Sequence, residues 1–316
     1  MRLLGLERIV ERMTTTSELA TLAMHLLPDD MLVAALQLWL EEDGFMRGDV
    51  TSRAMQSASG VLGAAVTVRD GGVLSGMQPL VRAVQASPMF EDVQFEAMAQ
   101  DGARVDAGAV IGTLSGPAGD VLGLERLLLN MLARLCGIAT LTRQYVEAID
   151  GTTATICTTR KTTPGLRRFE KYAAACGGAT LHRLGLDDAA LFKDNHLAGT
   201  SDGEFTMVVT EACRRARAER VLSFVEVEVD TLEQFNGALA IEPGLVDMVL
   251  LDNFDLNMLR EAVRRRDMEG SGLLLEASGG VALETVRPIA ETGVDRISVG
   301  ALTHQAQSID VGLDVA

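Results

Sequence analysis

Residues 223–230 read SFVEVEVD, and this stretch carries the pattern on which the fold prediction rests. Its valines, at positions 225, 227 and 229, alternate with Glu226, Glu228 and Asp230. Successive side chains of a β-strand point to opposite faces, so one face of this strand is wholly apolar and the other wholly acidic. In a barrel the valines would meet the surrounding helices, and the acids would point inward.

Short apolar segments alternate with helical ones throughout the chain after Asp150. The predicted strands are TATICT (153–158), ATLHRL (179–184), AALFK (189–193), SFVEVEV (223–229), DMVLLD (247–252), GLLLEA (272–277) and DRISVG (295–300). Residues 204–220 and 256–268 have helical spacing between strands. This alternation predicts a parallel sheet, and six or seven such units in about 150 residues favour a barrel over an open sheet.

The first half of the chain has a different rhythm and predicts a small α+β domain. Its expected elements are helices at 30–42 and 77–87 and short strands at 64–70, 71–77 and 93–99. Glycines at the turns of residues 101–116 predict a hairpin, and the apolar period of residues 120–149 predicts one or two helices leading into the second half. Residues 1–13 are expected to be either an amphipathic surface helix or sequence upstream of a start at Met13.

Composition and charge exclude several functional classes. A formal net charge of −16 argues against nucleic acid or an anionic membrane as a partner, because such partners require a basic face. The four cysteines are widely spaced and lack zinc-ligand spacing, so we expect reduced thiols in the core. Because the sequence shows neither a signal peptide nor an uncharged apolar run of about 18 residues, we expect a cytoplasmic protein.

All three lysines of the chain, which has 25 arginines, fall within one short segment: Lys161, Lys171 and Lys193. The same segment, residues 158–196, also holds Arg160, Arg167, Arg168, Arg183, His182 and His196. Cations concentrated in an acidic protein predict a receptor for a small molecule with several carboxylates or phosphates. A solvated basic face is the alternative for any single arginine. A lysine retained where arginine otherwise prevails indicates a site that needs a compact point charge.

Polar residues stand at the carboxyl ends of the predicted strands, which converge on one mouth in a barrel. Glu228 and Asp252 form a carboxylate pair that suits hydrated Mg²⁺, although the pair could also serve in acid–base catalysis or form ion pairs with the lysines. The glycine turns of residues 276–281 (EASGGV) and 298–303 (SVGALT) follow the last two strands, the usual place for a phosphate site in barrels. Together these features predict a phosphorylated sugar with a Mg²⁺-bound diphosphate, beside a second substrate that carries carboxylates.

These motifs resemble those of the quinolinate phosphoribosyltransferase family, also called nicotinate-nucleotide pyrophosphorylase (carboxylating). The matching stretches are GDVTSRA (48–54), LERLLLNMLARLCGIAT (124–140), TRKTTPGLRRFEKYAAACGG (159–178), HRLGLDDAALFKDNH (182–196), VEVEVDTLEQ (225–234), LLDNF (250–254), EASGGV (276–281) and ISVGALTH (297–304). They occur in family order and cover nearly all of the chain from about Asp29 onward.

The resemblance implies transfer of phosphoribose from phosphoribosyl pyrophosphate to quinolinate, yielding nicotinate mononucleotide, pyrophosphate and CO₂ for NAD synthesis. It implies that the carboxylates of quinolinate are held by Arg160, His182, Arg183 and Lys193, with Arg126 donated across the interface of a homodimer or a higher oligomer. The ribose and the Mg²⁺-diphosphate would be contacted by the catalytic group Lys161, Glu228 and Asp252, with the two acids as metal ligands. The residues implied around the 5′-phosphate are Ser278, Gly279, Gly280 and Gly300.

The fold implied by the resemblance is an N-terminal α+β sandwich domain followed by an incomplete, seven-strand parallel α/β barrel. The predicted divisions are an N-terminal extension at 1–29, the sandwich domain at 30–136, the barrel at 137–302 and a C-terminal tail at 303–316 that packs back on the sandwich domain.

The chain departs from the family pattern at two positions beside the proposed carboxylate site. The family often has aspartate where Thr158 stands and asparagine where Leu181 stands. Threonine at position 158 also resembles a paralogue encoded in molybdate-transport operons, which would act on a different pyridine or related acid. The residues also leave open a barrel lyase in which Lys161 or Lys193 forms a Schiff base, and a catalytically silent nucleotide-binding relative.

Overall fold

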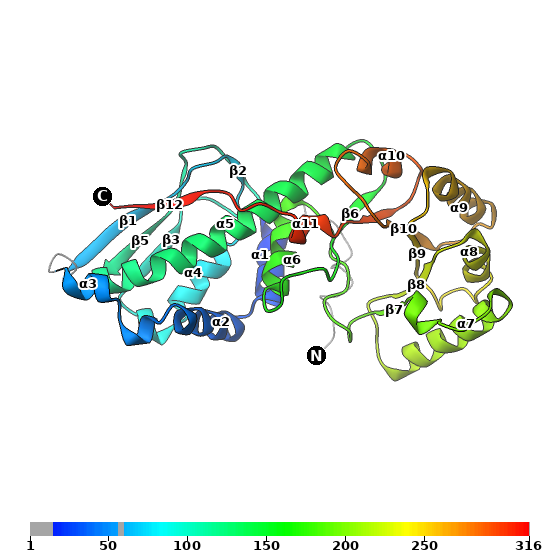
Figure 1. The fold of residues 1–316 in the computed structure, drawn as a ribbon, viewed down its shortest axis with the longest axis horizontal. Coiled ribbons are helices and arrows are strands. Elements are labelled where there is room, and N and C mark those ends of the chain that lie inside the picture. The colour runs from blue at the N-terminus through cyan, green and yellow to red at the C-terminus, as the bar shows by residue number, and fades with distance from the viewer. Residues whose placement is uncertain (1–14, 56–59, 316) are drawn as a thin grey trace. The chain divides into compact units, whose positions relative to one another are not determined.

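The computed structural model describes residues 15–55 and 60–315 (Figure 1). These residues form two compact units, each built from several segments of the chain. The parallel-sheet unit contains residues 144–162 and 179–304, and the antiparallel-sheet unit contains residues 15–55, 60–143, 163–178 and 305–315. Residues 1–14 lie outside the described part of the chain, and with them the two interpretations of residues 1–13.

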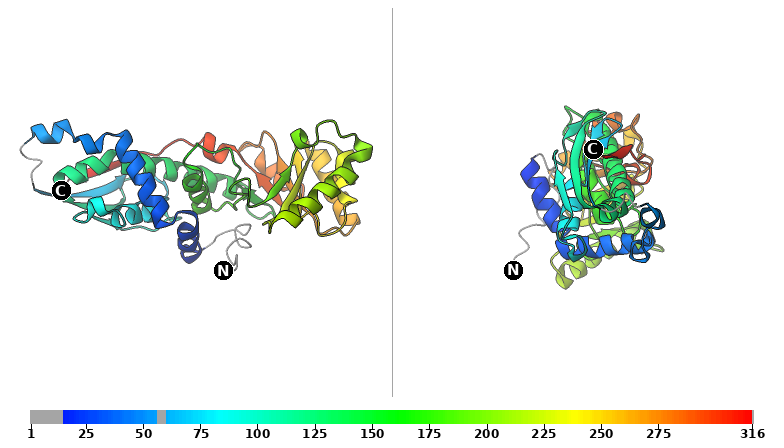
Figure 2. Two further views of the ribbon diagram at one scale, coloured as in Figure 1. Left: turned by 90° about the horizontal axis from the view of Figure 1, so that it is seen from below. Right: turned by 90° about the vertical axis from the view of Figure 1, so that its left-hand side faces the viewer.

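The antiparallel-sheet unit is built on two sheets. Its strands are β1 (Val61–Val68), β2 (Gly72–Val73), β3 (Gln94–Ala97), β4 (Arg104–Val105), β5 (Val110–Pro117) and β12 (Val311–Val315). Four of them form a sheet in the order β12-β1-β5-β3, and β2 pairs with β4. The C-terminal strand β12 runs antiparallel to β1, with Val66 opposite Leu313, and both views in Figure 2 show the C-terminus at this sheet.

The predicted hairpin at residues 101–116 is wrong, because its two strands join different sheets. β4 pairs with β2, whereas β5 lies between β1 and β3. The glycines do mark turns, but sequence alone does not say which partner each strand meets.

Helices cover the antiparallel-sheet unit: α1 (Thr16–Leu26), α2 (Asp29–Glu42), α3 (Val50–Ala54), α4 (Met77–Gln85), α5 (Ala118–Ala148, within this unit as far as Arg143) and α6 (Arg167–Gly177), with short 3₁₀ turns η1 (Phe45–Arg47) and η3 (Pro88–Phe90). Asp101, which is almost fully buried, caps α4 by accepting from the backbone N–H groups of Met77 and Gln78, and it also accepts from the hydroxyl of Tyr172 on α6. Burial raises the pKa of Asp101, while these three donors favour the carboxylate. The cap thus connects α4 to α6.

The compact units do not follow the predicted domain boundaries. The boundary predicted after residue 136 falls inside α5, which is one continuous helix of 31 residues. Helix α1, predicted to belong to an extension, and helix α6, predicted to belong to the barrel, are both part of the antiparallel-sheet unit. Both helices contribute fully buried apolar side chains, Leu26 and Phe169 among them, and this burial accounts for their place in that unit.

The parallel-sheet unit contains a six-stranded sheet in the order β6-β11-β10-β9-β8-β7. Its strands are β6 (Thr155–Cys157), β7 (Ala190–Phe192), β8 (Val225–Val229), β9 (Met248–Asp252), β10 (Leu274–Ser278) and β11 (Arg296–Ser298), and all their pairings are parallel. The seventh predicted strand, residues 179–184, is reduced to a single parallel bridge between Thr180 and Cys157 of β6. The predicted incomplete barrel therefore has six strands and one bridge.

Helices lie outside this sheet in chain order: α7 (Asp202–Glu219), α8 (Leu232–Leu239), α9 (Leu256–Met268) and α10 (Val286–Ala290), followed by α11 (Ala301–His304) (Figure 1). A 3₁₀ turn, η4 (Asp194–His196), follows β7. Each crossover returns the chain to the amino-terminal end of the next strand, and side-chain caps mark the starts of α8 and α9. The carboxylate of Asp255, for example, accepts from the backbone N–H groups of Asn257 and Met258.

No single helix among the described residues has the length and apolar character needed to cross a membrane, although α1 and α2, bent by 69° at their junction, satisfy these criteria as a pair. All four cysteines are buried and free, as the sequence predicted.

Gly137 on α5 allows the segment before β12 to approach the helix closely. A Cβ at this position would lie 2.0 Å from the carbonyl oxygen of Gln307. We predict that Gly137→Ala lowers the free energy of unfolding by about 1–3 kcal/mol, because the helix and the C-terminal segment must separate. Denaturant unfolding measures the effect.

Gly119→Ala is the matched control, since it lies on the same helix and a Cβ there meets nothing within 4 Å. Alanine should leave the stability unchanged or raise it by up to about 1 kcal/mol. Equal unfolding curves for the two variants would contradict the proposed close approach.

Candidate active site

A cavity of about 490 Å³ opens at the carboxyl ends of the parallel strands. Every strand of the sheet contributes to it: Lys161 follows β6, Lys193 follows β7, and the acids come from the ends of β8 and β9. Eleven of the twelve predicted site residues line this cavity: Arg160, Lys161, His182, Arg183, Lys193, Glu228, Asp252, Ser278, Gly279, Gly280 and Gly300. The parallel sheet alone explains this convergence, because all its strands end at the same edge.

Two of the three lysines lie at this cavity, and the third does not. Lys161 and Lys193 line it, whereas Lys171 is fully buried on α6 in the antiparallel-sheet unit. The clustering of lysines along the sequence therefore pointed to the site because of Lys161 and Lys193. Lys171 belongs to the core of the antiparallel-sheet unit.

The cations of the cavity are partly balanced by its own acids. The Nζ of Lys193 lies 2.5 Å from Oε2 of Glu228. Burial raises the pKa of Glu228, an effect that Lys193 opposes and the nearby Asp252 reinforces. Burial and the neighbouring Arg160 lower the pKa of the Arg183 guanidinium. Two arginines that repel each other in a half-buried pocket are ready to bind an anion.

The glycine turn after β10 requires the conformation that glycine provides. Gly279 and Gly280 have φ values of 99° and 57°. A Cβ at Gly279 would lie 2.1 Å from Oδ1 of Asn253, which itself has a φ of 56° and donates its backbone N–H to the carbonyl of Ser278. The two loops after β9 and β10 are thus packed backbone against backbone, which leaves little freedom at this edge of the cavity.

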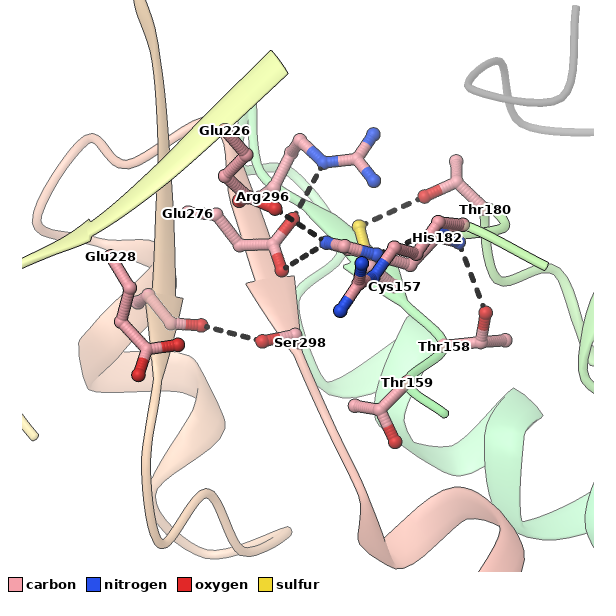
Figure 3. Close-up of polar contacts among 12 residues, drawn as sticks. Cys157, Thr158, Thr159, Thr180, His182, Glu226, Glu228, Glu276, Arg296 and Ser298 are labelled. Carbon is pink, nitrogen blue, oxygen red and sulfur yellow. Dashed lines mark hydrogen bonds and ion pairs between the residues drawn. The ribbon is translucent and has the colours of Figure 1, made fainter. Parts of the chain in front are cut away.

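Behind His182 lies a buried charged network that the sequence did not reveal (Figure 3). Nε2 of His182 lies 2.8 Å from Oε2 of Glu226 and 3.5 Å from Oε1 of Glu276. Nε of Arg296 donates to Oε2 of Glu276 at 2.9 Å. Both glutamates are completely buried and Arg296 nearly so. The available signals were Glu226 on the acidic face of its strand, and the charged residues Glu276 and Arg296 within two strands that are otherwise largely apolar.

The network has a defined charge pattern. Burial alone would raise the pKa of Glu276, but His182 and Arg296 outweigh it and lower that pKa. Burial and the charge of Glu276 raise the pKa of Glu226, whereas its hydrogen bond to His182 acts in the opposite direction. Glu276 is therefore the firmly ionised acid, paired with Arg296, and Glu226 depends on His182 for its partner.

His182, Glu226 and Glu276 also form a group of potential metal ligands, the one such group found among residues 15–55 and 60–315. The guanidinium of Arg296 already neutralises one of the two carboxylates, and His182 donates to the other. Each carboxylate thus already has a side-chain partner, and we assign the group to the support of His182 rather than to a metal.

Comparison with known proteins identifies the family of this chain. Residues 138–314 match the sequence signature of the quinolinate phosphoribosyl transferase C-terminal domain, and residues 49–136 match that of the N-terminal domain. A nicotinate-nucleotide pyrophosphorylase [carboxylating] of Mycobacterium leprae is 40% identical over 87% of this chain and 94% of its own length. The chain belongs to the quinolinate phosphoribosyltransferase family. A protein of Bacillus subtilis named "Probable nicotinate-nucleotide pyrophosphorylase [carboxylating]" is 37% identical over 88% of this chain and 90% of its own length.

A solved structure of the quinolinate phosphoribosyltransferase family has the same fold. The nicotinate-nucleotide pyrophosphorylase from Francisella tularensis superimposes with a TM-score of 0.81 at 34% identity, covering 92% of this chain and 97% of its own. The C-terminal family match contains all eleven residues that line the cavity, and the N-terminal match contains Arg126. The two matched ranges thus span the positions of all twelve predicted site residues.

Arg126, the twelfth predicted residue, lies on α5 in the antiparallel-sheet unit. It is exposed, with Nη2 3.8 Å from Oε1 of the neighbouring Glu125, and it lines a separate hollow of about 250 Å³ with Trp39 and Asn130. Its role at the site of a second subunit stays a prediction.

Thr158, where the family often has aspartate, has a structural function here. It is buried, and its hydroxyl oxygen accepts the backbone N–H of His182 at 3.1 Å (Figure 3). Leu181, the second departure, is buried as well. Both positions therefore hold the segment that carries His182 and Arg183.

Proposed function

We propose that the protein transfers the phosphoribosyl group of phosphoribosyl pyrophosphate to quinolinate, with loss of CO₂ and pyrophosphate, to give nicotinate mononucleotide in NAD synthesis. The observation that carries this proposal is the single cavity lined by Arg160, Arg183, Lys193, the acid pair and the glycine turn. The arginines and Lys193 would bind a dicarboxylate, the acid pair would bind the metal ion of a diphosphate, and the glycine turn would bind a monophosphate. We further propose a cytoplasmic location.

The cationic side of the cavity would bind the pyridine dicarboxylate. Arg160 and Arg183 repel each other, and a carboxylate between them relieves that repulsion. Lys193 would hold the second carboxylate. Its hydrogen bond to Glu228 fixes the ammonium at the cavity wall, so little side-chain freedom is lost on binding. This arrangement orients the ring nitrogen toward the ribose.

The opposite side of the cavity would hold the phosphoribosyl donor. Ser278, Gly279, Gly280 and Gly300 would surround the 5′-phosphate, with backbone N–H groups as donors. Lys161 stands beside Gly300, where a Cβ would lie 2.8 Å from the lysine Cδ. The hydroxyl of Thr303 donates to the carbonyl of Lys161 at 2.5 Å and so anchors its backbone. We propose that Lys161 neutralises charge on the departing pyrophosphate.

In the reaction the pyridine nitrogen attacks C1 of the ribose while the bond from C1 to pyrophosphate breaks, through a transition state of oxocarbenium character. Fixed cations in a partly enclosed cavity stabilise the developing negative charge on the leaving group. The 2-carboxylate then leaves as CO₂, and its electron pair remains on carbon beside the cationic ring nitrogen until a proton replaces it. No side-chain nucleophile is needed.

Glu228 and Asp252 fit a Mg²⁺ site, because they line the same cavity from adjacent strand ends and offer the oxygen ligands that this ion prefers. When bound, Mg²⁺ would offset charge on the diphosphate oxygens. The influence of Asp252 on the pKa of Glu228 supports their proximity.

We predict quinolinate-dependent CO₂ release with phosphoribosyl pyrophosphate and Mg²⁺, reduced about a hundredfold or more in Lys161→Ala and Arg183→Ala, because each removes a charge that stabilises the bound anions. A radiometric CO₂ assay that also compares nicotinate and other pyridine acids checks both activity and substrate choice. Arg215→Ala is the control, since this arginine on α7 is 77% exposed and pairs only locally with Glu211. Full activity in both cavity variants would refute the site assignment.

We predict that Asp252→Asn and Glu228→Gln each raise the Mg²⁺ concentration for half-maximal rate about tenfold, equivalent to about 1.4 kcal/mol of lost binding. Titration of activity with Mg²⁺ after chelation measures this. Glu211→Gln, an exposed acid of α7, should show the wild-type curve. Activity that persists in excess chelator would exclude a metal role for the pair.

We also propose a homodimer in which Arg126 completes the partner's cavity. Lys161→Ala and Arg126→Ala should then complement each other: mixed dimers contain one site with both residues intact, so random mixing should restore about a quarter of wild-type activity. The measurement is the activity of the refolded or co-expressed mixture beside each variant alone. A mixture no more active than its components would rule out donation of Arg126.

A further inference from the structure

Two hydrogen bonds of the His182 ring indicate where its proton lies. The backbone N–H of Arg183 donates to Nδ1 at 2.9 Å, so this nitrogen carries no proton in the structure. Nε2 faces the carboxylate of Glu226 at 2.8 Å and must be the protonated nitrogen. His182 is therefore a neutral imidazole whose single proton is directed into the protein.

The buried charged groups around His182 are two acids and one arginine, so negative charge is in excess while the imidazole is neutral. Glu226 from β8 and Glu276 from β10 are acids, and Arg296 from β11 is one cation. Cys157 from β6 adds no charge, because burial raises the pKa of its thiol to about 11. The ring of Phe224 packs edge-on against the imidazole at 5.1 Å. A second proton on His182 would neutralise the cluster.

Cations on the cavity side oppose that second proton. Arg183 follows His182 directly, and Arg160 lies close enough to lower the pKa of Arg183. Burial also disfavours the imidazolium, but Glu276 and Glu226 outweigh it and raise the pKa of His182. The imidazole is thus poised between buried acids that favour protonation and cavity arginines that oppose it.

An anionic ligand would remove the repulsion by which the cavity arginines oppose a second proton on His182. Its carboxylates would neutralise Arg160 and Arg183 and would offer an acceptor in the cavity that His182 lines. We propose that His182 takes up one proton from solvent at Nδ1 when a pyridine dicarboxylate binds, and that Glu226 is the positioning residue that permits this by holding the Nε2 proton. The new Nδ1–H and the backbone N–H of Arg183 cannot face each other, so both must then donate to the carboxylates of the ligand. This inference rests on the proposed function and adds a proton to its binding step.

This proton uptake makes ligand binding weaker as the pH rises above the pKa of His182. Well below the pKa of His182 the ring is already protonated, and binding takes up no proton; above that pKa, binding must supply one. Because Glu276 and Glu226 raise the pKa of His182 above its ordinary value of about 6.5, the uptake should appear above that raised pKa, at about pH 8 and higher, where a pyridine dicarboxylate is fully ionised.

The test is calorimetric titration with quinolinate alone, at about pH 8, in buffers that differ in ionisation enthalpy. The full-length wild type should take up about 0.5 to 1 proton per ligand, and His182→Gln and Glu226→Gln should take up close to none. Glu170→Gln is the matched control: Glu170 is equally buried and pairs with Arg134, but it lies in the antiparallel-sheet unit. Its proton uptake should equal that of the wild type.

Steady-state kinetics of the wild type provide a second test, which does not depend on whether any variant folds. KM for quinolinate should rise about tenfold per pH unit above the pKa of His182, with kcat nearly constant. Turnover of quinolinate without proton uptake, or uptake that persists in His182→Gln, would overturn this inference and leave the proposed function intact. A wild type that neither binds nor converts quinolinate would overturn both.

Discussion

The pairing of buried polar and charged groups across the parallel sheet is the constraint on which the site depends. Arg296 neutralises Glu276 inside the sheet, and His182 satisfies Glu226, so two fully buried carboxylates are tolerated behind the cavity. His182, which contacts both glutamates, also lines the cavity. Removing Arg296 would leave an unpaired buried charge, and the support beneath His182 would be lost with it.

The cavity forms at the edge of the sheet where all the parallel strands end. Each strand end supplies a different group, from Lys193 after β7 to the glycine turn after β10. The positive φ values of Gly279 and Asn253 allow two adjacent loops to meet at that edge. The strand ends therefore supply chemically different groups to the cavity, and the sheet holds these groups in place.

Lysine and arginine have different tasks at this cavity. Lys193 forms one short contact with Glu228, which a compact ammonium can make without displacing its neighbours. Arg160 and Arg183 present planar groups with several donors, which suit carboxylates. The arginine-rich composition of the chain makes the retained lysines informative, although Lys171 shows that burial in another core can retain one as well.

The sequence by itself determined the alternation of strands and helices and the residues at strand ends, because side-chain periodicity and turn residues are local properties. It also carried the family motifs. Tertiary structure alone decided that β4 and β5 join different sheets, that α6 belongs to the antiparallel-sheet unit, and that residues 179–184 form one bridge. It also brought Glu226, Glu276 and Arg296 together behind His182. These residues lie on β8, β10 and β11, and β9 separates β8 from β10, so only the folded sheet as a whole brings them together.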